Sequence, residues 1–371
     1  MFPGYSNFLP MKVAIACGGT GGHLFPGLAV AEVLKDRGHE VLLLISEKRI
    51  DAIAVGNRKG FRIEKVPAVG LTKLVSIEFF SFVAKFLNGL ATCLRLYRSF
   101  KPDAVLGMGG FTSTGPILAG RIIGLPTFVH ESNAIPGKAN RLNALLSKKV
   151  LLGFQECARY FPDKVVEVTG TPIRDSLRCP VDRGQALKNL RLNNGLQTVL
   201  VMGGSQGAHG INEAVVAVLR RFGEKEVQFI HLTGKEDENY VYECYRKEGI
   251  PAFVSAFYDR MEEAYTIADL AVARSGAASL TELSYFGLPT ILIPYPFAAE
   301  NHQFFNAEIF ARHGVAEVLE ESRVNGDTLS SLIDHFLNNG ALVRRPAGQS
   351  AALGPETAAN RIVEIIEKSR K

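Results

Sequence analysis

Short apolar runs alternate with helix-like segments along most of the chain. In the first half, continuous apolar runs predict strands over residues 12–17, 41–46, 104–108, 127–130 and 149–153. Residues 26–37 are predicted to form a helix, with Pro26 in its first turn. Strands that are apolar at every position are typical of sheets covered on both faces. Their alternation with helices therefore predicts an α/β fold built on a doubly wound parallel sheet.

The same pattern restarts in the second half, where strands are predicted over 198–202, 227–232, 269–273 and 290–293. Between the halves, residues 169–196 contain few long apolar runs and include Gly170, Pro172 and Pro180. We therefore expect a loose extension over 1–10, an N-terminal domain over 11–173 and a C-terminal domain over 174–350. Residues 355–371 are expected to form an amphipathic helix that packs back on the N-terminal domain.

A weak internal repeat supports two related domains. Residues 15–23 read IACGGTGGH and residues 201–209 read VMGGSQGAH. Each segment is a predicted strand, a glycine-rich turn and the start of a helix. The sequence thus predicts two Rossmann-like domains facing one another across a cleft, with ligands at the carboxyl ends of the strands.

Composition and charge narrow the classes of function. A length of 371 residues fits two domains, and the net charge of +5 fits phosphate-bearing ligands or an anionic membrane surface. A nucleic-acid partner is disfavoured because no dense Lys/Arg tract with interleaved aromatic residues occurs. The five cysteines form no CxxC pair, which disfavours a disulfide framework or a zinc site and fits a reducing cytosol.

The most membrane-like segment does not read as a transmembrane helix. Residues 79–97 include Lys85, Asn88 and Arg95, and the first ten residues do not resemble a signal peptide. The segment 71–86 nevertheless combines apolar residues with lysines, which suits a helix lying in the interface of an anionic leaflet. The alternative is a long core helix of the N-terminal domain.

Two glycine-rich turns stand out in the first half. Residues 18–23, GGTGGH, follow a predicted strand, so their N–H groups could face an anion, but they match neither GxGxxG nor a Walker A loop. His23 could act as a general base, or it could cap the helix or pack within the loop. Residues 107–116, GMGGFTSTGP, form a second such turn, and residues 130–133, HESN, place polar groups at a strand end. A ligand-free turn and a buried structural network are the respective alternatives.

Three segments of the second half carry polar or small residues at predicted strand ends. In residues 203–208, GGSQGA, Ser205 could donate to a phosphate oxygen. In residues 274–282, RSGAASLTE, a helix is expected to begin near Ser279, and Glu282 could accept from a ribose diol or complete a capping box with Ser279. Residues 299–307, AENHQFFNA, offer amide and imidazole groups suited to sugar hydroxyls, or form an ordinary polar helix start.

Taken together, these segments resemble the pattern of glycosyltransferase family 28. The resemblance rests on GGTGGHLFPGLAVA, GGFTSTGP, HESNAIPGKAN, GTPIR, GGSQGA, RSGAASLTEL and ENHQFFNA, and it runs from Lys12 to the final helix. It implies the GT-B fold, with UDP-N-acetylglucosamine (UDP-GlcNAc) in the C-terminal domain and the acceptor in the N-terminal domain. The implied reaction transfers N-acetylglucosamine to the C4 hydroxyl of N-acetylmuramic acid in undecaprenyl-pyrophosphoryl-N-acetylmuramoyl-pentapeptide (lipid I), forming lipid II for peptidoglycan.

The resemblance also implies roles for individual residues. His23 is the expected general base, Arg174 reaches the nucleotide, Tyr258 contacts uracil through its backbone, and Ser205 meets the diphosphate. The full implied donor set is Thr20, Gly21, Gly22, Asn133, Arg174, Ser205, Tyr258, Ala277, Ala278, Ser279, Leu280, Thr281, Glu282, His302 and Gln303. The expected acceptor and membrane residues are Gly109, Gly110, Thr112, Leu74, Phe79, Phe82 and Lys85.

The implied chemistry is a single inverting displacement without a cofactor. No DxD motif stands at a predicted strand end, so helix dipoles and N–H groups are expected to carry the leaving-group charge without a metal. The enzyme is expected at the cytoplasmic face of the plasma membrane as a peripheral protein, with cell-wall synthesis or division proteins as partners. Alternatives are a glycosyltransferase using UDP-galactose and diacylglycerol, a UDP-sugar epimerase, and a dinucleotide oxidoreductase, which the missing GxGxxG disfavours.

Overall fold

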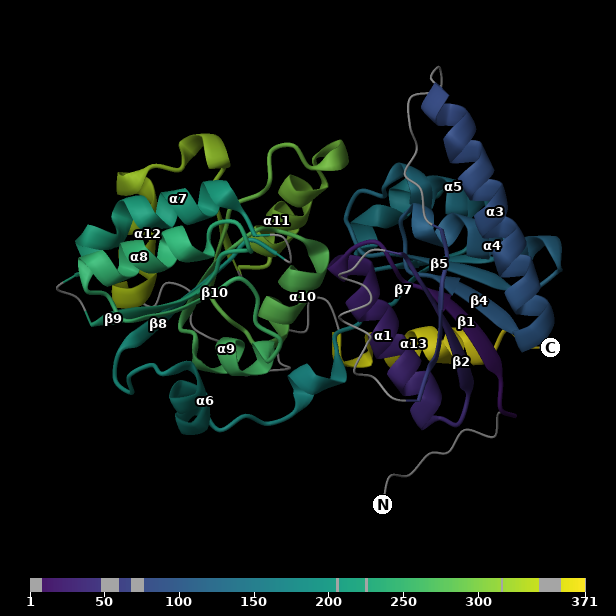
Figure 1. Ribbon diagram of the computed structural model, residues 1–371, viewed down its shortest axis with the longest axis horizontal. Coiled ribbons are helices and arrows are strands. Elements are labelled where there is room, and N and C mark those ends of the chain that lie inside the picture. The colour runs from purple at the N-terminus through teal and green to yellow at the C-terminus, as the bar shows by residue number, and fades with distance from the viewer. Residues whose placement is uncertain are drawn as a thin grey trace. The chain divides into compact units, whose positions relative to one another are not determined.

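The computed structural model describes residues 9–47, 60–67, 77–204, 207–223, 226–314, 316–339 and 355–370. The chain divides into two compact units (Figure 1). Unit 1 consists of Met1–Arg174 and Leu353–Lys371, and unit 2 consists of Asp175–Ala352. Each unit is built on one parallel sheet, so the predicted α/β class with two doubly wound sheets is confirmed.

Within the described residues, the sheet of unit 1 has the strand order β3-β2-β1-β4-β5-β6-β7. Its strands are β1 (Lys12–Ala16), β2 (Glu40–Ile45), β3 (Arg62–Lys65), β4 (Ala104–Gly107), β5 (Thr127–Glu131), β6 (Lys149–Leu152) and β7 (Val166–Val168). Alternate residues of the central strands enter different cores. Val13 and Ile15 pack with one set of helices, whereas Ala14 and Ala16 pack on the opposite face. This explains why these strands read as continuous apolar runs.

The helices of unit 1 cover both faces of that sheet. They are α1 (Gly21–Asp36), α3 (Ile77–Phe100), α4 (Thr114–Ile122), α5 (Lys138–Leu146) and α13 (Pro355–Glu367). The last helix lies beside α1 (Figure 1) and contributes Ile362 and Ile366 to the same core cluster. Glu367 is buried there and accepts hydrogen bonds from His39 and Arg37 at 2.9 Å each. The final helix is therefore part of unit 1, although unit 2 precedes it in the chain.

In unit 2 the described strands follow the order β10-β9-β8-β11-β12-β13. The strands are β8 (Gln197–Met202), β9 (Val227–Leu232), β10 (Ala252–Ser255), β11 (Leu270–Ala273), β12 (Thr290–Leu292) and β13 (Ala316–Val318). The helices are α6 (Arg183–Leu190), α7 (His209–Val218), α8 (Glu238–Glu248), α9 (Met261–Ile267), α10 (Ala277–Tyr285), α11 (His302–Arg312) and α12 (Gly326–Asn339).

Both sheets reverse their strand order at an equivalent point. In unit 1 the chain leaves β1 in one direction and returns to its other side at β4, and in unit 2 it does the same at β8 and β11. Such a switch point leaves a crevice at the carboxyl ends of the strands, where ligands of doubly wound sheets bind. The two glycine-rich turns of the internal repeat follow β1 and β8, so each lies at the switch point of its own unit.

Some predicted boundaries were wrong. The helix expected over 26–37 begins at Gly21, so Pro26 lies inside α1 and the last residues of GGTGGH already belong to the helix. The helix expected near Ser279 begins at Ala277. The short edge strands β3, β7, β10 and β13 were not predicted, because their sequences are brief or alternate with charged residues. Among the described residues, no helix is long and apolar enough to cross a membrane.

Candidate functional site

The turn after β1 delivers His23 to the first turn of α1. Thr20 is the N-cap residue, and its carbonyl accepts from the N–H groups of His23 and Leu24 at 3.1 and 3.0 Å. Gly21 and Gly22 are the first helical residues and add no bulk around the helix end. His23 is thus not the N-cap, which removes the capping alternative for this residue. Its position in the first turn of α1 places it at the carboxyl edge of the sheet.

The imidazole of His23 lies against the second glycine-rich turn, which follows β4. A Cβ atom placed on Gly109 would lie 2.9 Å from His23 Cε1 and 3.0 Å from His23 Nδ1. The same construction on Gly110 gives 3.3 Å to His23 Nε2. Gly109 has φ of 110°, which side-chain-bearing residues rarely adopt. The glycines predicted as acceptor residues therefore form the surface on which His23 rests.

Ser113 and Thr112 hold this turn against β1. The Ser113 hydroxyl lies 2.8 Å from the carbonyl of Gly109 and 3.2 Å from that of Ala16. Thr112 is buried, and its Oγ1 would lie 2.9 Å from a Cβ on Gly19. The two glycine-rich turns of unit 1 are thus packed together, as expected where β1 and β4 are neighbours.

A buried polar cluster at the end of β5 lies near His23. His130 Nε2 donates to the carbonyl of Gly170 at 2.9 Å, so Nδ1 is the acceptor for the Ser132 hydroxyl at 3.2 Å. Burial lowers the pKa of His130 to about 4, and the nearby His23 also lowers it. His130 is therefore a neutral, fixed imidazole that holds the segment containing Gly170 in place.

Glu131 organises the rest of the cluster. It is buried and accepts from Asn133 N, Asn133 Nδ2, Gly137 N and Asn140 Nδ2 at 2.8–3.2 Å. Burial raises the pKa of its carboxyl group, and these hydrogen bonds oppose that rise. Asn140 also donates to the His130 carbonyl at 3.1 Å and lies beside Gly109. Asn133 is thus tied to Glu131, and Asn140 emerges as a support for the floor under His23 that the sequence did not single out.

Arg174 lies in unit 1, beside α1. It is buried, and its guanidinium stacks 4.3 Å above the ring of Phe25, two residues after His23. The sequence assigned Arg174 to the start of the C-terminal domain, whereas the structure groups it with the N-terminal residues. Its guanidinium therefore holds a positive charge against α1.

In unit 2 the turn after β8 is held tightly against β9. Gly207 N donates to the carbonyl of Gly204 at 3.0 Å. A Cβ on Gly207 would lie only 2.2 Å from the carbonyl oxygen of Thr233, so the turn touches the backbone that follows β9. Ser205, predicted to meet the diphosphate, lies outside the described residues. The described parts of the turn lead directly into the first residue of α7.

The amino end of α10 is open. Gly276 is its N-cap, no side chain caps the helix, and a Cβ on Gly276 would meet no atom within 4 Å. The capping box of Ser279 with Glu282 is therefore wrong, because Ser279 lies inside the first turn. Thr281 donates to the carbonyl of Ala277 at 2.8 Å. The N–H groups of the first turn, with the helix dipole behind them, form a site suited to an anion.

Glu282 lies one turn further along α10 and is held by Tyr265 of α9. The buried Tyr265 hydroxyl donates to Glu282 Oε2 at 2.8 Å. Glu282 is 8% exposed, so its carboxylate is fixed rather than free in solvent. Tyr258 lies elsewhere in unit 2, where its hydroxyl donates to Glu263 and its ring packs edge-on against Phe253. Burial is the largest cause of its raised pKa, with the Glu263 hydrogen bond second.

At the start of α11, hydrogen bonds within the protein fix the orientation of two polar side chains. His302 Nδ1 donates to the carbonyl of Ala299 at 2.7 Å, so Nε2 is the ring nitrogen that remains for a ligand. Gln303 Oε1 accepts from Tyr295 N at 3.0 Å, so the NH₂ group is the end of this amide that can donate to a ligand. Glu300 and Asn301, just before them, have φ of 54° and 52°. Consecutive left-handed residues without glycine are costly and occur often at functional sites.

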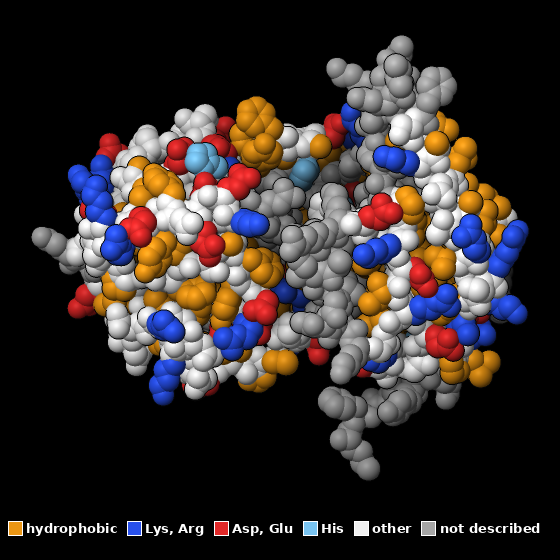
Figure 2. Space-filling view, in the orientation of Figure 1, with side chains coloured by type: hydrophobic (Ala, Val, Ile, Leu, Met, Phe, Trp, Pro, Cys, Tyr) orange, Lys and Arg blue, Asp and Glu red, His pale blue; other side chains and the backbone are white. Residues whose placement is uncertain are grey.

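Helix α3 contains most of the predicted membrane residues. Leu74 lies outside the described residues, and Phe79 lies in the first turns of the helix. Phe82 stacks on Phe86 with ring centroids 6.3 Å apart, Lys85 is exposed, and Leu87 is 56% exposed. Its carboxyl half is different, because Cys93, Tyr97 and Phe100 are buried in the core. Figure 2 shows hydrophobic side chains between basic ones on the side of unit 1 where α3 lies.

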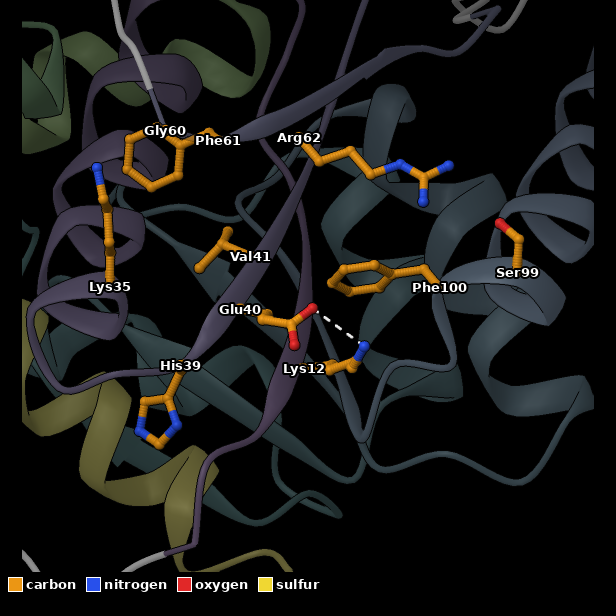
Figure 3. Close-up of a pocket in the computed structure, with 10 residues that line it drawn as sticks. All are labelled: Lys12, Lys35, His39, Glu40, Val41, Gly60, Phe61, Arg62, Ser99 and Phe100. Atoms are coloured by element: carbon orange, nitrogen blue, oxygen red, sulfur yellow. Dashed lines mark ion pairs between the residues drawn. The ribbon is translucent and has the colours of Figure 1, made fainter.

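The described residues of unit 1 also line a pocket of about 340 Å³ at the opposite edge of the sheet (Figure 3). Lys12, Glu40 and Arg62 begin β1, β2 and β3, so the pocket lies at the amino ends of these strands. Lys12 pairs with Glu40 at 3.0 Å, and Arg62 pairs with Glu64 at 3.2 Å. Because these charges already have partners, the pocket is a poor site for the donor. Among the described residues of both units, no group of three or more His, Cys, Asp and Glu side chains could hold a metal ion.

Comparison with known proteins gives a consistent result. The model of the glycosyltransferase family 28 N-terminal domain matches residues 13–152, and that of the C-terminal domain matches residues 198–362. A protein of Halothermothrix orenii is 37% identical over 97% of this chain and 100% of its own length. Its name is UDP-N-acetylglucosamine--N-acetylmuramyl-(pentapeptide) pyrophosphoryl-undecaprenol N-acetylglucosamine transferase. A protein of Geobacter sulfurreducens with the same name is also 37% identical, over 97% of this chain and 100% of its own.

Solved structures support the fold. The crystal structure of Acinetobacter baumannii MurG matches with a TM-score of 0.72 and 26% identity, covering 97% of this chain and 100% of that one. A UDP-GlcNAc 2-epimerase of Neisseria meningitidis matches with a TM-score of 0.66 over 96% of this chain and 100% of that one, but at 13% identity it shows the fold alone. Both matches extend over two units of the GT-B type. On the family models and the full-length relatives, the chain belongs to glycosyltransferase family 28.

Proposed function

We propose that this protein is an inverting N-acetylglucosaminyltransferase that transfers the sugar of UDP-GlcNAc to the C4 hydroxyl of N-acetylmuramic acid in lipid I, forming lipid II. The relatives named for this reaction match nearly the whole chain. The observation that carries the proposal is the open amino end of α10, followed one turn later by a carboxylate that Tyr265 holds in place. This arrangement suits a nucleotide diphosphate with a ribose beside it.

The donor is expected to bind unit 2 through α10 and α11. The first-turn N–H groups of α10 would bind the diphosphate, and the helix dipole adds about 0.3–1 kcal/mol for an exposed anion. Glu282 would accept hydrogen bonds from the ribose hydroxyls, each worth about 1.5–3 kcal/mol because the acceptor is charged. His302 Nε2 would accept from one sugar hydroxyl, and the Gln303 NH₂ group would donate to another.

The chemical step needs a base and a stabilised leaving group. We propose that His23 takes the proton of the C4 hydroxyl as that oxygen attacks the anomeric carbon of the donor. The bond from that carbon to the UDP oxygen breaks on the opposite face, so the linkage inverts. The negative charge on the departing UDP is stabilised by the N–H groups at the start of α10. Because backbone groups can carry this charge, we expect turnover to persist in the presence of a chelator.

The acceptor side is proposed to meet the membrane at α3. A helix that connects two parallel strands runs antiparallel to them, so the first turns of α3 lie at the carboxyl edge of the sheet. His23 and Gly109 lie at this same edge. The exposed Leu87 and the Phe82–Phe86 pair, with Lys85 among them, suit the interface of an anionic leaflet. Peripheral binding at the cytoplasmic face would bring a lipid-linked acceptor to the edge that carries His23.

The function is tested by measuring UDP release from UDP-GlcNAc with and without a lipid I analogue, in parallel with UDP-galactose. We expect release only with UDP-GlcNAc and acceptor together. Preference for UDP-galactose with diacylglycerol would identify the rival glycosyltransferase. Formation of a free epimer without acceptor would identify the epimerase, whose fold is shared. Either of these outcomes would overturn the proposed reaction.

The membrane contact is tested by sedimentation with liposomes containing anionic lipid. The double variant Phe82→Ser/Leu87→Ser removes apolar area from the exposed part of α3 and should weaken binding by about tenfold. Tyr242→Ser is the matched control, because Tyr242 is 52% exposed but lies on α8 of unit 2. Equal binding by both variants and the unmodified protein would exclude α3 as the contact.

A further inference from the structure

Two buried side chains join the helices that form the donor site of unit 2. Ser275 lies just before α10, and its hydroxyl donates to the carbonyl of Gln303 in the first turn of α11 at 2.7 Å. Asn306, one turn along α11, returns the contact by donating from Nδ2 to the carbonyl of Ser275 at 3.1 Å. Both residues are fully buried. The link is therefore reciprocal, with one hydrogen bond in each direction between the two helix starts.

Arg274 extends this link to the loop before α11. Its Nη1 donates to the carbonyls of Ile293 and Pro294 at 3.0 and 3.3 Å and pairs with Glu321. Its guanidinium also lies 5.4 Å from the ring centre of Tyr295. The N–H of Tyr295 in turn binds Gln303 Oε1. The loop that orients the Gln303 amide is thus fastened to the same strand end that carries Ser275.

We infer that Ser275 and Asn306 are positioning residues that fix the distance between the UDP-binding start of α10 and the sugar-binding start of α11. This inference rests on the proposed function of the two helices. Neither side chain is available to ligand, since each uses its polar atoms inside the protein. Their role is to hold the start of α11 at a fixed position relative to the start of α10. The nucleotide and the sugar of one donor molecule can then bind both helices at the same time.

The two helices are proposed to bind different parts of the donor, and this determines what a defect in the link would change. UDP requires only α10 and its neighbours, whereas UDP-GlcNAc also requires His302 and Gln303 of α11. A small shift of α11 relative to α10 leaves the nucleotide contacts intact but misplaces the sugar, whose position is set by the diphosphate. A displaced start of α11 would lose its hydrogen bonds to the sugar hydroxyls, each worth about 0.5–1.5 kcal/mol, so KM for UDP-GlcNAc would rise. A defect in the link should therefore separate the binding of UDP from the use of UDP-GlcNAc.

The test compares Ser275→Ala and Asn306→Asp with the unmodified enzyme. Ser275→Ala removes the donor to Gln303, and Asn306→Asp places an oxygen against the Ser275 carbonyl where an NH₂ group stood. We expect KM for UDP-GlcNAc to rise about tenfold in each variant, while Kd for UDP changes less than about twofold. Retained UDP binding also shows that α10 is folded. Thr290→Val is the matched control, because it removes another buried hydroxyl bond of unit 2, to Leu288 at 2.8 Å.

The possible outcomes are distinct. Parallel weakening of UDP and UDP-GlcNAc, or no change in either, would overturn the inference, because the link would then act on the whole unit or on nothing. A KM effect of Thr290→Val equal to that of Ser275→Ala would overturn it as well. If the unmodified enzyme fails to use UDP-GlcNAc, the proposed function is wrong, and that result is visible before any variant is compared.

Discussion

The ring of His23 rests on Gly109, so closely that a Cβ atom there would lie 2.9 Å from His23 Cε1. Gly109→Ala should displace the imidazole and lower kcat by about tenfold or more. The change also strains the backbone, since φ is 110°. Gly124→Ala is a suitable control, because Gly124 also has positive φ, 78°, but a Cβ there meets no atom within 4 Å. Equal loss of activity in both variants would mean that strain, rather than the contact with His23, is responsible.

His23→Ala should remove the general base. We expect kcat to fall by about 10²–10⁴-fold, with little change in Kd for UDP, because UDP is proposed to bind unit 2. Steady-state kinetics with saturating acceptor and isothermal titration with UDP would measure the two effects. His335→Ala, at an exposed position on α12, serves as the control for loss of a histidine. Retention of full kcat in His23→Ala would assign the proton transfer to another group.

Gly276→Ala probes the anion site of α10 without straining the chain. Gly276 has φ of −67° and ψ of 134°, which alanine adopts readily, and its Cβ would point into open space. The methyl group should therefore leave folding intact but obstruct the approach of a phosphate to the first-turn N–H groups. We expect UDP affinity to drop about tenfold or more while the thermal unfolding temperature stays within about 2 °C. Unchanged UDP affinity would place the diphosphate elsewhere.

The ribose assignment can be tested with the ligand as well as with the protein. Glu282→Ala should weaken UDP by about 10–100-fold and abolish the preference for UDP over 2′,3′-dideoxy-UDP. Tyr265→Phe, which removes only the hydroxyl that holds Glu282, should reduce the same preference in part. Binding competition would measure both ligands in each variant. A preference that survives in Glu282→Ala would show that the ribose hydroxyls contact other residues.

Two buried histidines should make stability fall as pH is lowered. Burial lowers the pKa of His130 to about 4 and that of His231 to about 3, whereas an unfolded histidine titrates near pH 6.5. Below pH 6.5 the unfolded chain binds protons that the folded protein does not bind until these lower values are reached. Each group therefore reduces the free energy of unfolding by about 1.4 kcal/mol per pH unit in that window.

Urea unfolding at pH 7, 6 and 5 would measure this dependence. His231→Gln should flatten the pH dependence for unit 2, even if the variant is less stable overall. In the native protein His231 donates to Asn212 and receives the Tyr245 hydroxyl, at 3.0 and 3.1 Å, so a glutamine can keep part of that pairing. An unchanged slope in His231→Gln would indicate that this imidazole does not titrate on unfolding.

The sequence by itself determined the central framework. Runs such as 13–16 and 199–202 are apolar at every position, because both faces of a central parallel strand are buried, and they were located almost to the residue. The glycine-rich turns could also be identified from the sequence, since only small residues allow the backbone at a strand end to approach another chain segment closely. Position at a strand end in turn predicted which motifs lie at the ligand-binding edge of each sheet.

Tertiary structure decided the rest, because it depends on contacts between distant residues. The edge strand β3 reads RIEK and has one neighbour, so no apolar run marks it. The start of α10 is set by Gly276 in an extended conformation after β11, and the Ser279–Glu282 spacing was misleading because Glu282 instead meets Tyr265, 17 residues away in the chain. The same holds for Asn140 beneath Gly109 and for Asn306 bound to Ser275. Periodicity reveals which positions are buried, but only the folded chain shows which buried polar groups are paired.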